Sequence, residues 1–321
     1  MCDRIRQYIL LSLLGLIAIT LVGCQKEASQ LRVGTNLWIG YEPLYLAREL
    51  GYYRDTSIKL LEMNNATEVS SALRAGLLDV AALTLDEALT VKQDVPDLQV
   101  VLVMDSSAGA DILLGQPEIA DLTDLRGKRV GVETTAVGAI LLQAALEKAR
   151  LSVQDVEIVS LPVDEHLEAF EAKRIDAVVT FDPVRSRLLQ LGARPLFDSR
   201  ATPNRIIDVL VIHQSTAEQH GKQLRKLIEG HFAALAYLAQ HPEDAKKSMA
   251  NRIKITPAQI ADMLGGIHIQ DRSENVTLLS GTPSPLNRLA EQIADVMTKN
   301  KMLSKTVELH NLSDPRWVKQ P

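Results

Sequence analysis

The chain lacks the residues that several classes of protein require. Only two of its 321 residues are cysteines, Cys2 and Cys24, and both lie near the N-terminus, which excludes a disulfide-stapled fold and a cysteine zinc site. An excess of positive charge is also absent, since 35 Lys and Arg stand against 40 Asp and Glu for a net charge of −5. We therefore expect no nucleic-acid binding, because such domains present a basic face.

Catalytic motifs are missing as well. The sequence contains no His-Glu-x-x-His, no Gly-x-Ser-x-Gly and no glycine-rich phosphate loop. The seven histidines are scattered, and we interpret them as surface residues. The sequence therefore predicts a protein that is not an enzyme, with no cofactor and no metal site.

The N-terminal residues have the pattern of an export signal. Arg4 and Arg6 precede an apolar run over 8–22, shorter than the ~20 residues that span a bilayer. The run ends in Leu21-Val22-Gly23-Cys24, which resembles the bacterial lipobox, whose cysteine is lipidated and becomes the first mature residue. This predicts a lipoprotein signal peptide over 1–23, lipidation with palmitate at Cys24 and a tether over 24–30. A single uncleaved membrane anchor is the alternative.

The remaining chain contains an internal repeat with an offset of 97 residues. Arg32-Val33-Gly34 recurs as Arg129-Val130-Gly131, and Leu78-Asp79 is matched by Ile175-Asp176. We interpret this as two similar halves, with chance similarity between βαβ units as the alternative. Strands alternate with helices in each half, which predicts parallel sheets covered on both faces. The expected strands are 31–36, 58–63, 79–84, 129–132, 156–161 and 176–180, and the expected helices are 43–51, 67–75, one from Asp86, 137–149, 165–172 and 183–191.

The candidate site residues follow the strands, because ligands of open α/β sheets bind beyond the carboxyl ends of the strands. In the order of the strands they are Trp38, Tyr41, Thr84, Asp86, Thr134, Thr135 and Asp182. Thr134 and Thr135 precede an expected helix, whose N-terminus suits an oxyanion or a polar head group. Plain N-capping explains the threonines and the aspartates equally well, and packing is the alternative for Trp38.

Several stretches resemble the nitrate/taurine/sulfonate-type solute-binding proteins of ABC importers. The first covers residues 34–47 and continues into Gly51-Tyr52-Tyr53, and the second is Leu125-Arg126-Gly127-Lys128-Arg129-Val130-Gly131-Val132. Leu73-Arg74-Ala75-Gly76, which runs into Asp79, and Phe181-Asp182-Pro183 also fit that family. The likeness covers residues 31 to about 213, and it is specific for the family but not for the ligand.

The resemblance implies an α/β type II periplasmic-binding-protein fold, with two lobes, a two-strand hinge and a ligand cleft between the lobes. Residues 31–108 and 208–321 would form lobe 1, and 109–205 would form lobe 2. The hinge would cross near 106–113 and 202–211. Ser107 and Asp111 in the first crossing join the candidate ligand-binding residues.

The implied function is that of a monomeric solute-binding lipoprotein that delivers a small polar solute to ABC permease subunits. It would lie in the cell envelope, facing the periplasm or the cell exterior, and touch the membrane only through its lipid anchor. Two alternatives remain open. The same clamshell could report ligand occupancy to a membrane signalling protein, or the chain could be a pyrimidine-synthase-like enzyme on the same fold.

The acidic residues near the expected cleft bear on the ligand. They are Glu42, Asp86, Asp111, Glu133 and Asp182, and the second crossing offers Arg205 as its only candidate cation. A buried unpaired carboxylate beside an anionic ligand is costly. The pattern therefore favours a neutral or cationic nitrogenous ligand, such as a pyrimidine or an amine, over a sulfonate or nitrate. Acids that point away or pair with lysines would leave the anionic ligands open.

Overall fold

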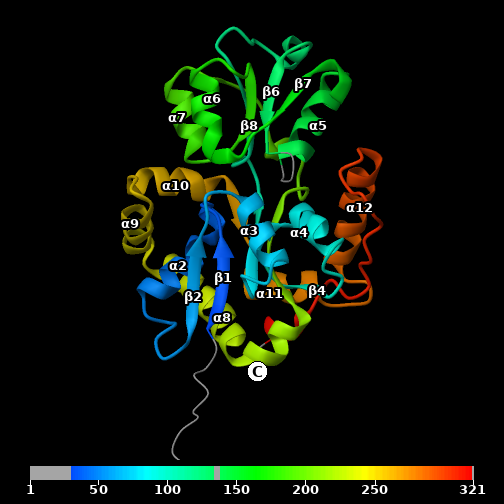
Figure 1. Ribbon diagram of the computed structural model, residues 1–321. Coiled ribbons are helices and arrows are strands. Elements are labelled where there is room, and N and C mark those ends of the chain that lie inside the picture. Colours follow the sequence, from blue (N-terminus) through cyan, green and yellow to red (C-terminus); the bar gives the residue numbers. More distant parts are fainter. Residues whose placement is uncertain (1–29, 134–137, 320–321) are drawn as a thin grey trace, which may run out of the picture. The chain divides into compact units, whose positions relative to one another are not determined.

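The computed structural model describes residues 30–133 and 138–319 (Figure 1). Residues from Leu31 onward form one compact unit with two sheets, ordered β11-β4-β10-β3-β1-β2 in sheet A and β7-β6-β8-β5-β9 in sheet B. Sheet A contains β1 (Leu31–Thr35), β2 (Ile58–Glu62), β3 (Val80–Thr84), β4 (Leu98–Ser107), β10 (Ile207–His213) and β11 (Ile267–Ile269). Sheet B contains β5 (Ile112–Gly115), β6 (Arg129–Val132), β7 (Glu157–Ser160), β8 (Ala177–Thr180) and β9 (Arg194–Asp198).

Helices cover both sheets. They are α2 (Glu42–Glu49), α3 (Ala66–Arg74), α4 (Leu85–Lys92), α5 (Gly138–Lys148), α6 (His166–Glu171), α7 (Val184–Gln190), α8 (Gln214–Gln240), α9 (Pro242–Ile253), α10 (Pro257–Gly265), α11 (Arg272–Leu279) and α12 (Pro285–Lys299). Short 3-10 turns cover Ile39–Tyr41, Leu122–Leu125, Val153–Asp155, Val163–Glu165, Ser199–Ala201 and Pro315–Trp317. In the described residues, no helix has both the length and the apolar character to cross a membrane.

The strands and helices expected in the two halves are confirmed, with boundaries that differ by at most two residues; the helix start expected at 137 lies outside the described residues. The parallel cores β2-β1-β3 and β7-β6-β8 have the same order. Their registers match as well, since Val33 pairs with Val80 in sheet A and Val130 pairs with Ala177 in sheet B. The internal repeat therefore reflects two structurally similar halves.

The expected strands pair in parallel, but each sheet also contains antiparallel strands that the sequence did not predict. β10 runs antiparallel to both β3 and β4, and β5 runs antiparallel to both β8 and β9. The cause is the path of the chain, which leaves sheet A after β4, enters sheet B as β5 and returns through residues 199–206 into β10. A strand that comes back from the other sheet enters from the opposite end and has to run against its neighbours.

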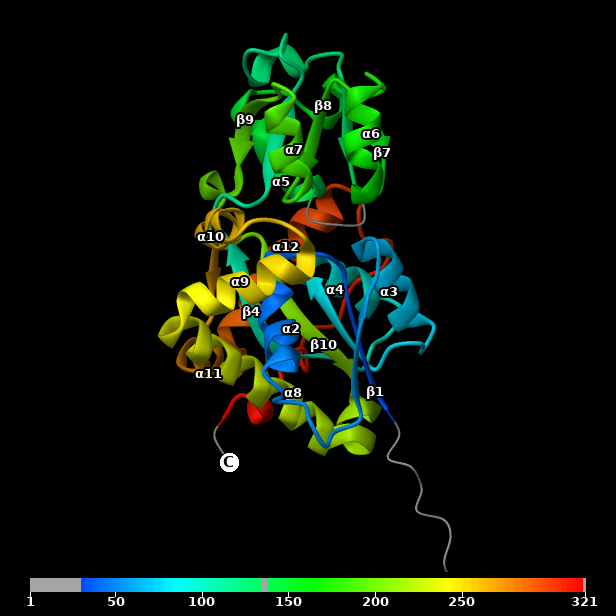
Figure 2. The same cartoon turned by 90° about the vertical axis from the view of Figure 1, so that its left-hand side faces the viewer.

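Burial follows the position of each strand. β3 is buried along its whole length, as expected for a central strand covered on both faces, whereas the edge strand β7 is mostly exposed. The helices after β10 belong to sheet A, where α8 packs against α2 and α12 packs against α4 (Figure 2). Near the C-terminus, Trp317 is buried and donates its Nε1–H to Asp314 Oδ2 at 2.9 Å.

Candidate functional site

A small pocket, with a cavity volume of about 30 Å³, lies between the two sheets. Its described lining comes from the ends of β1 and β3, from the start of α3, from both crossing segments and from sheet B: Asn36, Trp38, Tyr41, Ala66, Thr84, Glu87, Asp111, Glu133, Phe181, Ile206 and Asp208. Both parallel cores therefore direct the carboxyl ends of their strands at one cavity, as open α/β sheets do.

An aromatic pair joins the two sides of the pocket. Trp38, which follows β1, packs edge-to-face on Phe181, which follows β8, with ring centroids 5.3 Å apart and planes at 89°. This geometry is favourable for aromatic rings. Trp38 Nε1–H donates to both carboxylate oxygens of Asp105 at 3.2 Å. The backbone passes so close to Asp105 that a Cβ on Gly40 would lie 1.8 Å from Oδ2, so only glycine fits there.

Six buried carboxyl groups surround or adjoin this pocket: Asp86, Glu87, Asp105, Asp111, Glu133 and Asp208. Burial raises the pKa of each, because a desolvated carboxyl disfavours its charged form. Burial, assisted by the charge of Asp111, raises the pKa of Asp105 to about 8. Burial, assisted by the charge of Asp86, raises the pKa of Asp111 to about 7. For Asp208 the causes are burial and then the charge of Asp105.

Two hydrogen-bond donors of the lining are engaged by these carboxyls. Tyr41 Oη–H donates to Asp208 Oδ1, and the backbone N–H of Thr84 donates to Glu87 Oε2 at 2.9 Å. Three lining oxygens, Thr84 Oγ1, Asp111 Oδ2 and Asp208 Oδ2, are buried without any hydrogen-bond partner. Buried polar atoms normally have partners, so the two carboxyl oxygens are acceptors in need of a donor, whereas the Thr84 hydroxyl can both donate and accept.

Polar contacts also connect the two sheets beside the pocket. The backbone N–H and the hydroxyl of Thr67 donate to Glu133 Oε1 at 3.2 and 2.7 Å. Asn65 caps α3 by accepting from the N–H of Glu68, and its Nδ2 donates to Asp164 Oδ1 at 3.0 Å. The N-terminus of α3 is thereby bound to two segments of the other half, one that follows β6 and one that follows β7.

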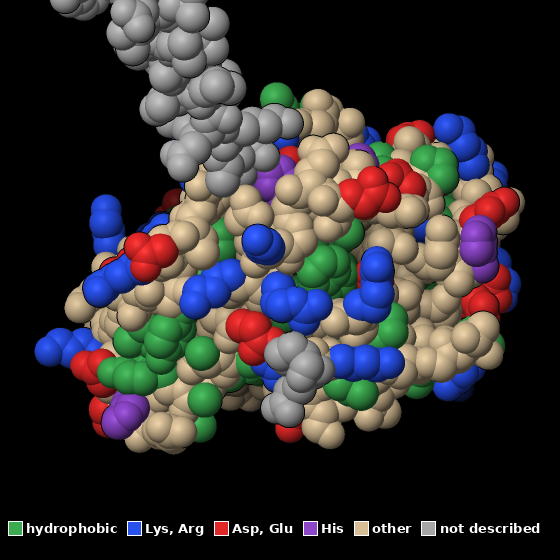
Figure 3. All heavy atoms as spheres, turned by 90° about the horizontal axis from the view of Figure 1, so that it is seen from below, with side chains coloured by type: hydrophobic (Ala, Val, Ile, Leu, Met, Phe, Trp, Pro, Cys, Tyr) green, Lys and Arg blue, Asp and Glu red, His purple; other side chains and the backbone are tan. Residues whose placement is uncertain are grey.

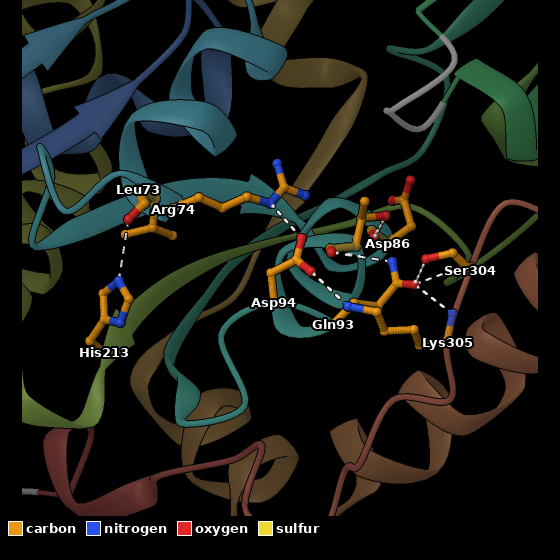
Figure 4. A network of polar contacts seen from close by, with 9 residues as sticks. Leu73, Arg74, Asp86, Gln93, Asp94, His213, Ser304 and Lys305 are labelled. Carbon is orange, nitrogen blue, oxygen red and sulfur yellow. Dashed lines mark hydrogen bonds and ion pairs between the residues drawn. The ribbon is translucent and has the colours of Figure 1, made fainter.

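Helix α4, which presents Asp86 and Glu87 at its first turn, is anchored at its other end (Figure 4). Gln93 Oε1 accepts from the N–H and the hydroxyl of Ser304 and from the N–H of Lys305 at 2.8 to 3.0 Å. Asp94 pairs with Lys305 and with Arg74 of α3. These contacts hold α4 against its neighbours and so fix the direction of its acidic first turn.

The predicted site residues divide into three groups. Trp38, Tyr41, Thr84 and Asp111 line the pocket. Asp86, Ser107 and Asp182 are buried but are absent from its described lining. Thr134, Thr135 and Cys24 lie outside the described residues.

The residues of the second group have structural contacts of their own. Ser107 Oγ bonds Ser199 Oγ at 2.7 Å and accepts from the N–H of Asp111 at 3.2 Å, which orients Asp111. Asp182 accepts from the N–H of Ser186 at 3.0 Å and pairs with Arg185, so its carboxylate is bonded to the first turn of α7. Asp86 packs beside the pocket at the start of α4.

Two other charged residues considered from the sequence lie away from the pocket. Glu42 pairs with Arg252, whose Nε–H donates to it at 2.8 Å. Arg205 lines a separate surface depression together with Lys148 and Phe197. The second crossing therefore supplies no cation to the described lining of the pocket.

Sequence reasoning missed Asp105 and Asp208 altogether. Both stand within long apolar runs, in β4 and β10, and both are buried. A single acid inside an otherwise apolar strand is the signal that could have found them, because burial of a charged group costs free energy unless it is paired. The interpretation of all histidines as surface residues is also wrong, since His166, His220 and His231 are buried.

Comparisons with known proteins relate the chain to a family and to solved structures with the same fold. The sequence profile of the NMT1-like family matches residues 24–254. The structure is similar to the alkanesulfonate-binding protein SsuA from Xanthomonas axonopodis pv. citri, solved with MOPS bound, at a TM-score of 0.75 and 22% identity over 88% of this chain and 96% of that one. It is also similar to the desulfurization enzyme DSZB, at a TM-score of 0.64 and 16% identity over 89% and 97% of the two chains.

The likeness to SsuA confirms the expected type II periplasmic-binding fold. In sequence, the chain is 30% identical over 84 residues to a protein of Brucella abortus (strain 2308) that is described as a binding protein. That match spans about a quarter of each chain, 26% of this one and 26% of the relative. The fold hosts both binding proteins and an enzyme, so the pocket has to indicate the function.

Proposed function

Because the chain belongs to the NMT1-like family, we propose that it is the extracytoplasmic solute-binding component of an ABC importer. It would capture a small polar solute between sheet A and sheet B and deliver it to the permease subunits. The observation that carries the proposal is the pocket itself, whose lining comes from both parallel cores and from both segments that connect them. The name of the similar SsuA protein, which binds alkanesulfonates, supports the same role.

The mechanism follows from the contacts beside the pocket. Thr67 with Glu133 and Trp38 with Phe181 are pairs that form only when the two sheets approach each other. A solute that touches both sides adds interactions that exist only in this arrangement, so it shifts the population toward the closed state. The permease would then distinguish the loaded protein from the empty one by its shape.

We also propose that the protein has a lipid anchor at its N-terminus and that it is a monomer without catalytic activity. Cys24 would carry the lipid anchor that holds the protein in the cell envelope, with more than one acyl chain because one chain binds a membrane only marginally. The protein would act as a monomer and without catalysis. Although the desulfurization enzyme shares the fold, no cysteine occurs between Cys24 and the C-terminus, so the pocket has no thiol nucleophile.

Tryptophan fluorescence of the full chain in detergent tests solute binding. Trp317→Phe leaves Trp38 as the only tryptophan. We expect at least one solute from a panel of sulfonates, nitrate, pyrimidines and amines to change the Trp38 emission and to raise the melting temperature. Phe181→Ala should reduce the emission change. If no solute has either effect, and no small molecule is released from the denatured protein, the binding function is wrong.

Uptake in cells separates import from signalling. Deletion of the gene should abolish uptake of the radiolabelled solute identified in the fluorescence assay. Normal uptake together with an altered transcriptional response to that solute would instead support the sensor alternative. For the anchor, labelled palmitate should be incorporated into the unaltered chain and into Cys2→Ser but not into Cys24→Ser.

A further inference from the structure

We propose that the solute is a small organic cation that carries N–H donors, a protonated amine with an apolar body. This inference rests on the proposed function and deepens it by assigning the ligand class of the same pocket. It depends on three features of the lining, namely the sign of its charges, the direction of its hydrogen bonds and its aromatic walls.

The charges of the described lining have one sign. Glu87, Asp111, Glu133 and Asp208 are lining residues, and no Lys, Arg or His is among them. Elsewhere Lys and Arg are plentiful, and on the face in Figure 3 their side chains are interspersed with acidic ones. A cationic solute would stabilise the ionised form of these buried carboxyls, which no neighbouring cation does, whereas an anionic solute would disfavour it further.

The direction of the hydrogen bonds points the same way. Trp38 Nε1–H and Tyr41 Oη–H are already directed at Asp105 and Asp208. Asp111 and Asp208 are each only 2% exposed, and each has an Oδ2 without a partner. The described lining thus offers two buried carboxyl oxygens as acceptors, and an ammonium group supplies donors to them, while Asn36 and Thr84 can bond a polar group elsewhere on the solute. A sulfonate has no donor to offer.

The aromatic walls suit the remainder of such a ligand. Trp38, Tyr41 and Phe181 line the pocket together with Ile206 and Ala66. Aromatic faces attract cations and also pack against apolar groups. In the described residues, no group of three or more His, Cys, Asp or Glu is placed to hold a metal ion, which favours an organic cation over a metal.

Three probes with the same benzyl body isolate the effect of charge. Benzylamine, benzyl alcohol and phenylmethanesulfonate are titrated separately into the full chain in detergent at pH 7.5, with calorimetry and thermal shift as measurements. Ethanolamine and putrescine extend the cations to other shapes, and zinc chloride tests a metal. We expect at least one of the three amines to bind about 10-fold or more tightly than the alcohol, and the sulfonate not to bind.

Isosteric variants then test the two orphaned oxygens. Asp111→Asn and Asp208→Asn should each weaken binding of the amine about 10-fold, which corresponds to about 1.4 kcal/mol and to one charge-assisted hydrogen bond. Binding of benzyl alcohol should change less than about 2-fold. Asp262→Asn makes the same chemical change at an exposed position and should have no effect. If a variant does not fold by circular dichroism, the comparison of probes on the unaltered protein still decides.

The possible outcomes distinguish an error in the ligand class from an error in the proposed solute-binding function. Tighter binding of the sulfonate or the alcohol than of every amine overturns the ligand class and leaves the solute-binding function standing. A response to zinc chloride alone also overturns the class. Failure of every probe together with failure of the wider solute panel overturns the solute-binding function itself.

Discussion

The two halves of the repeat, residues 31–92 and 129–190, can be compared position by position. In the first half, Arg32 donates its backbone N–H and two guanidinium N–H groups to Asp79 and a further one to the carbonyl of Gly76. In the second half, Arg129 makes the same four bonds to Asp176 and to the carbonyl of Lys173. The distances agree within 0.2 Å, from 2.7 to 3.0 Å in one half and from 2.8 to 3.0 Å in the other.

The likeness extends to the packing behind the first strand of each half. Gly34 lets Leu78 approach so closely that a Cβ would lie 2.2 Å from its Cδ1. Gly131 lets Ile175 approach in the same way, with a corresponding distance of 2.7 Å. These shared contacts hold the amino-terminal ends of β1, β3, β6 and β8 in register.

The halves differ where the strands end. After β3 the first half places Asp86 and Glu87, both buried with raised pKa values. After β8 the second half places Phe181, which packs on Trp38, and Asp182, whose carboxylate is satisfied by Ser186 and Arg185. At the ends of β3 and β8, one half thus contributes carboxyl groups and the other an aromatic ring. A common scaffold therefore leaves the chemistry of the strand ends free to vary.

The largest expected effect is the pH dependence of stability, which separates the carboxyls of the pocket from those of the scaffold. Asp105 and Asp111 have folded pKa values of about 8 and about 7, above the ~3.9 of an unfolded aspartate. The folded state thus binds more protons between about pH 4 and pH 8, and stability falls as the pH rises through that window, by at most about 1.4 kcal/mol per pH unit for each carboxyl. Asp105→Asn and Asp111→Asn should flatten the profile of melting temperature against pH.

The scaffold carboxyls titrate with the opposite sign. Burial alone would raise the pKa of Asp79, but hydrogen bonds from Arg32 hold it below its usual value. Hydrogen bonds from Arg129 likewise lower the pKa of Asp176. Their contribution is present above about pH 4 and is lost as the pH falls through the folded pKa. A melting temperature that does not change between pH 5 and pH 8 would contradict the prediction for the pocket.

Removal of the repeated ion pair should have the next largest effect. Asp79→Ala leaves two guanidinium N–H groups and the backbone N–H of Arg32 without their acceptor, for which we expect a loss of about 2–3 kcal/mol. Asp176→Ala should cost less, because the Asp176 side chain is 24% exposed and that of Asp79 is 13% exposed. Urea unfolding followed by circular dichroism measures both. An equal or larger loss for Asp176→Ala would show that exposure does not set the difference.

The glycine pair gives a smaller contrast. Gly34→Ala and Gly131→Ala overpack the space next to Leu78 and Ile175, and each should cost about 1–2 kcal/mol, with the larger loss at Gly34. The double substitution of Gly34→Ala with Leu78→Val should recover part of that loss because the two sites are in contact. If the losses of the two substitutions simply add, the Leu78 side chain is not what opposes a Cβ at position 34.

The smallest effect concerns the contact between the sheets. Glu133→Gln keeps an acceptor for the Thr67 hydroxyl but removes the charge, so we expect a change of only about 0.5–1 kcal/mol in stability. The effect on closure should be visible in the Trp38 emission of the Trp317→Phe background. Glu171→Gln, at an exposed position, is the matched control. If the two variants have identical Trp38 emission, Glu133 does not contribute to the closure of the two sheets.

Sequence reasoning reached the parallel cores because their signals are local. The repeated Arg-Val-Gly and the apolar run of β3 are each a pattern of a few consecutive residues, and the strand ends next to them included Trp38 and Thr84. It failed for β10, whose neighbours β3 and β4 are more than a hundred residues earlier in the chain. Asp208 enters the pocket through that pairing, and no local pattern encodes such a contact. The lobe boundaries, Thr134, Thr135 and the lipid anchor stay predictions.

Asn65 uses the two ends of its amide for different purposes, and this has a consequence for the opening of the protein. Its oxygen holds the first turn of α3, while its nitrogen reaches Asp164 on the other side. When the sheets separate, only the second bond is given up, and water can replace it at a partly exposed position. Helix α3 should therefore move as a rigid body, because loss of the bond from Asn65 to Asp164 leaves the bond that caps the helix in place.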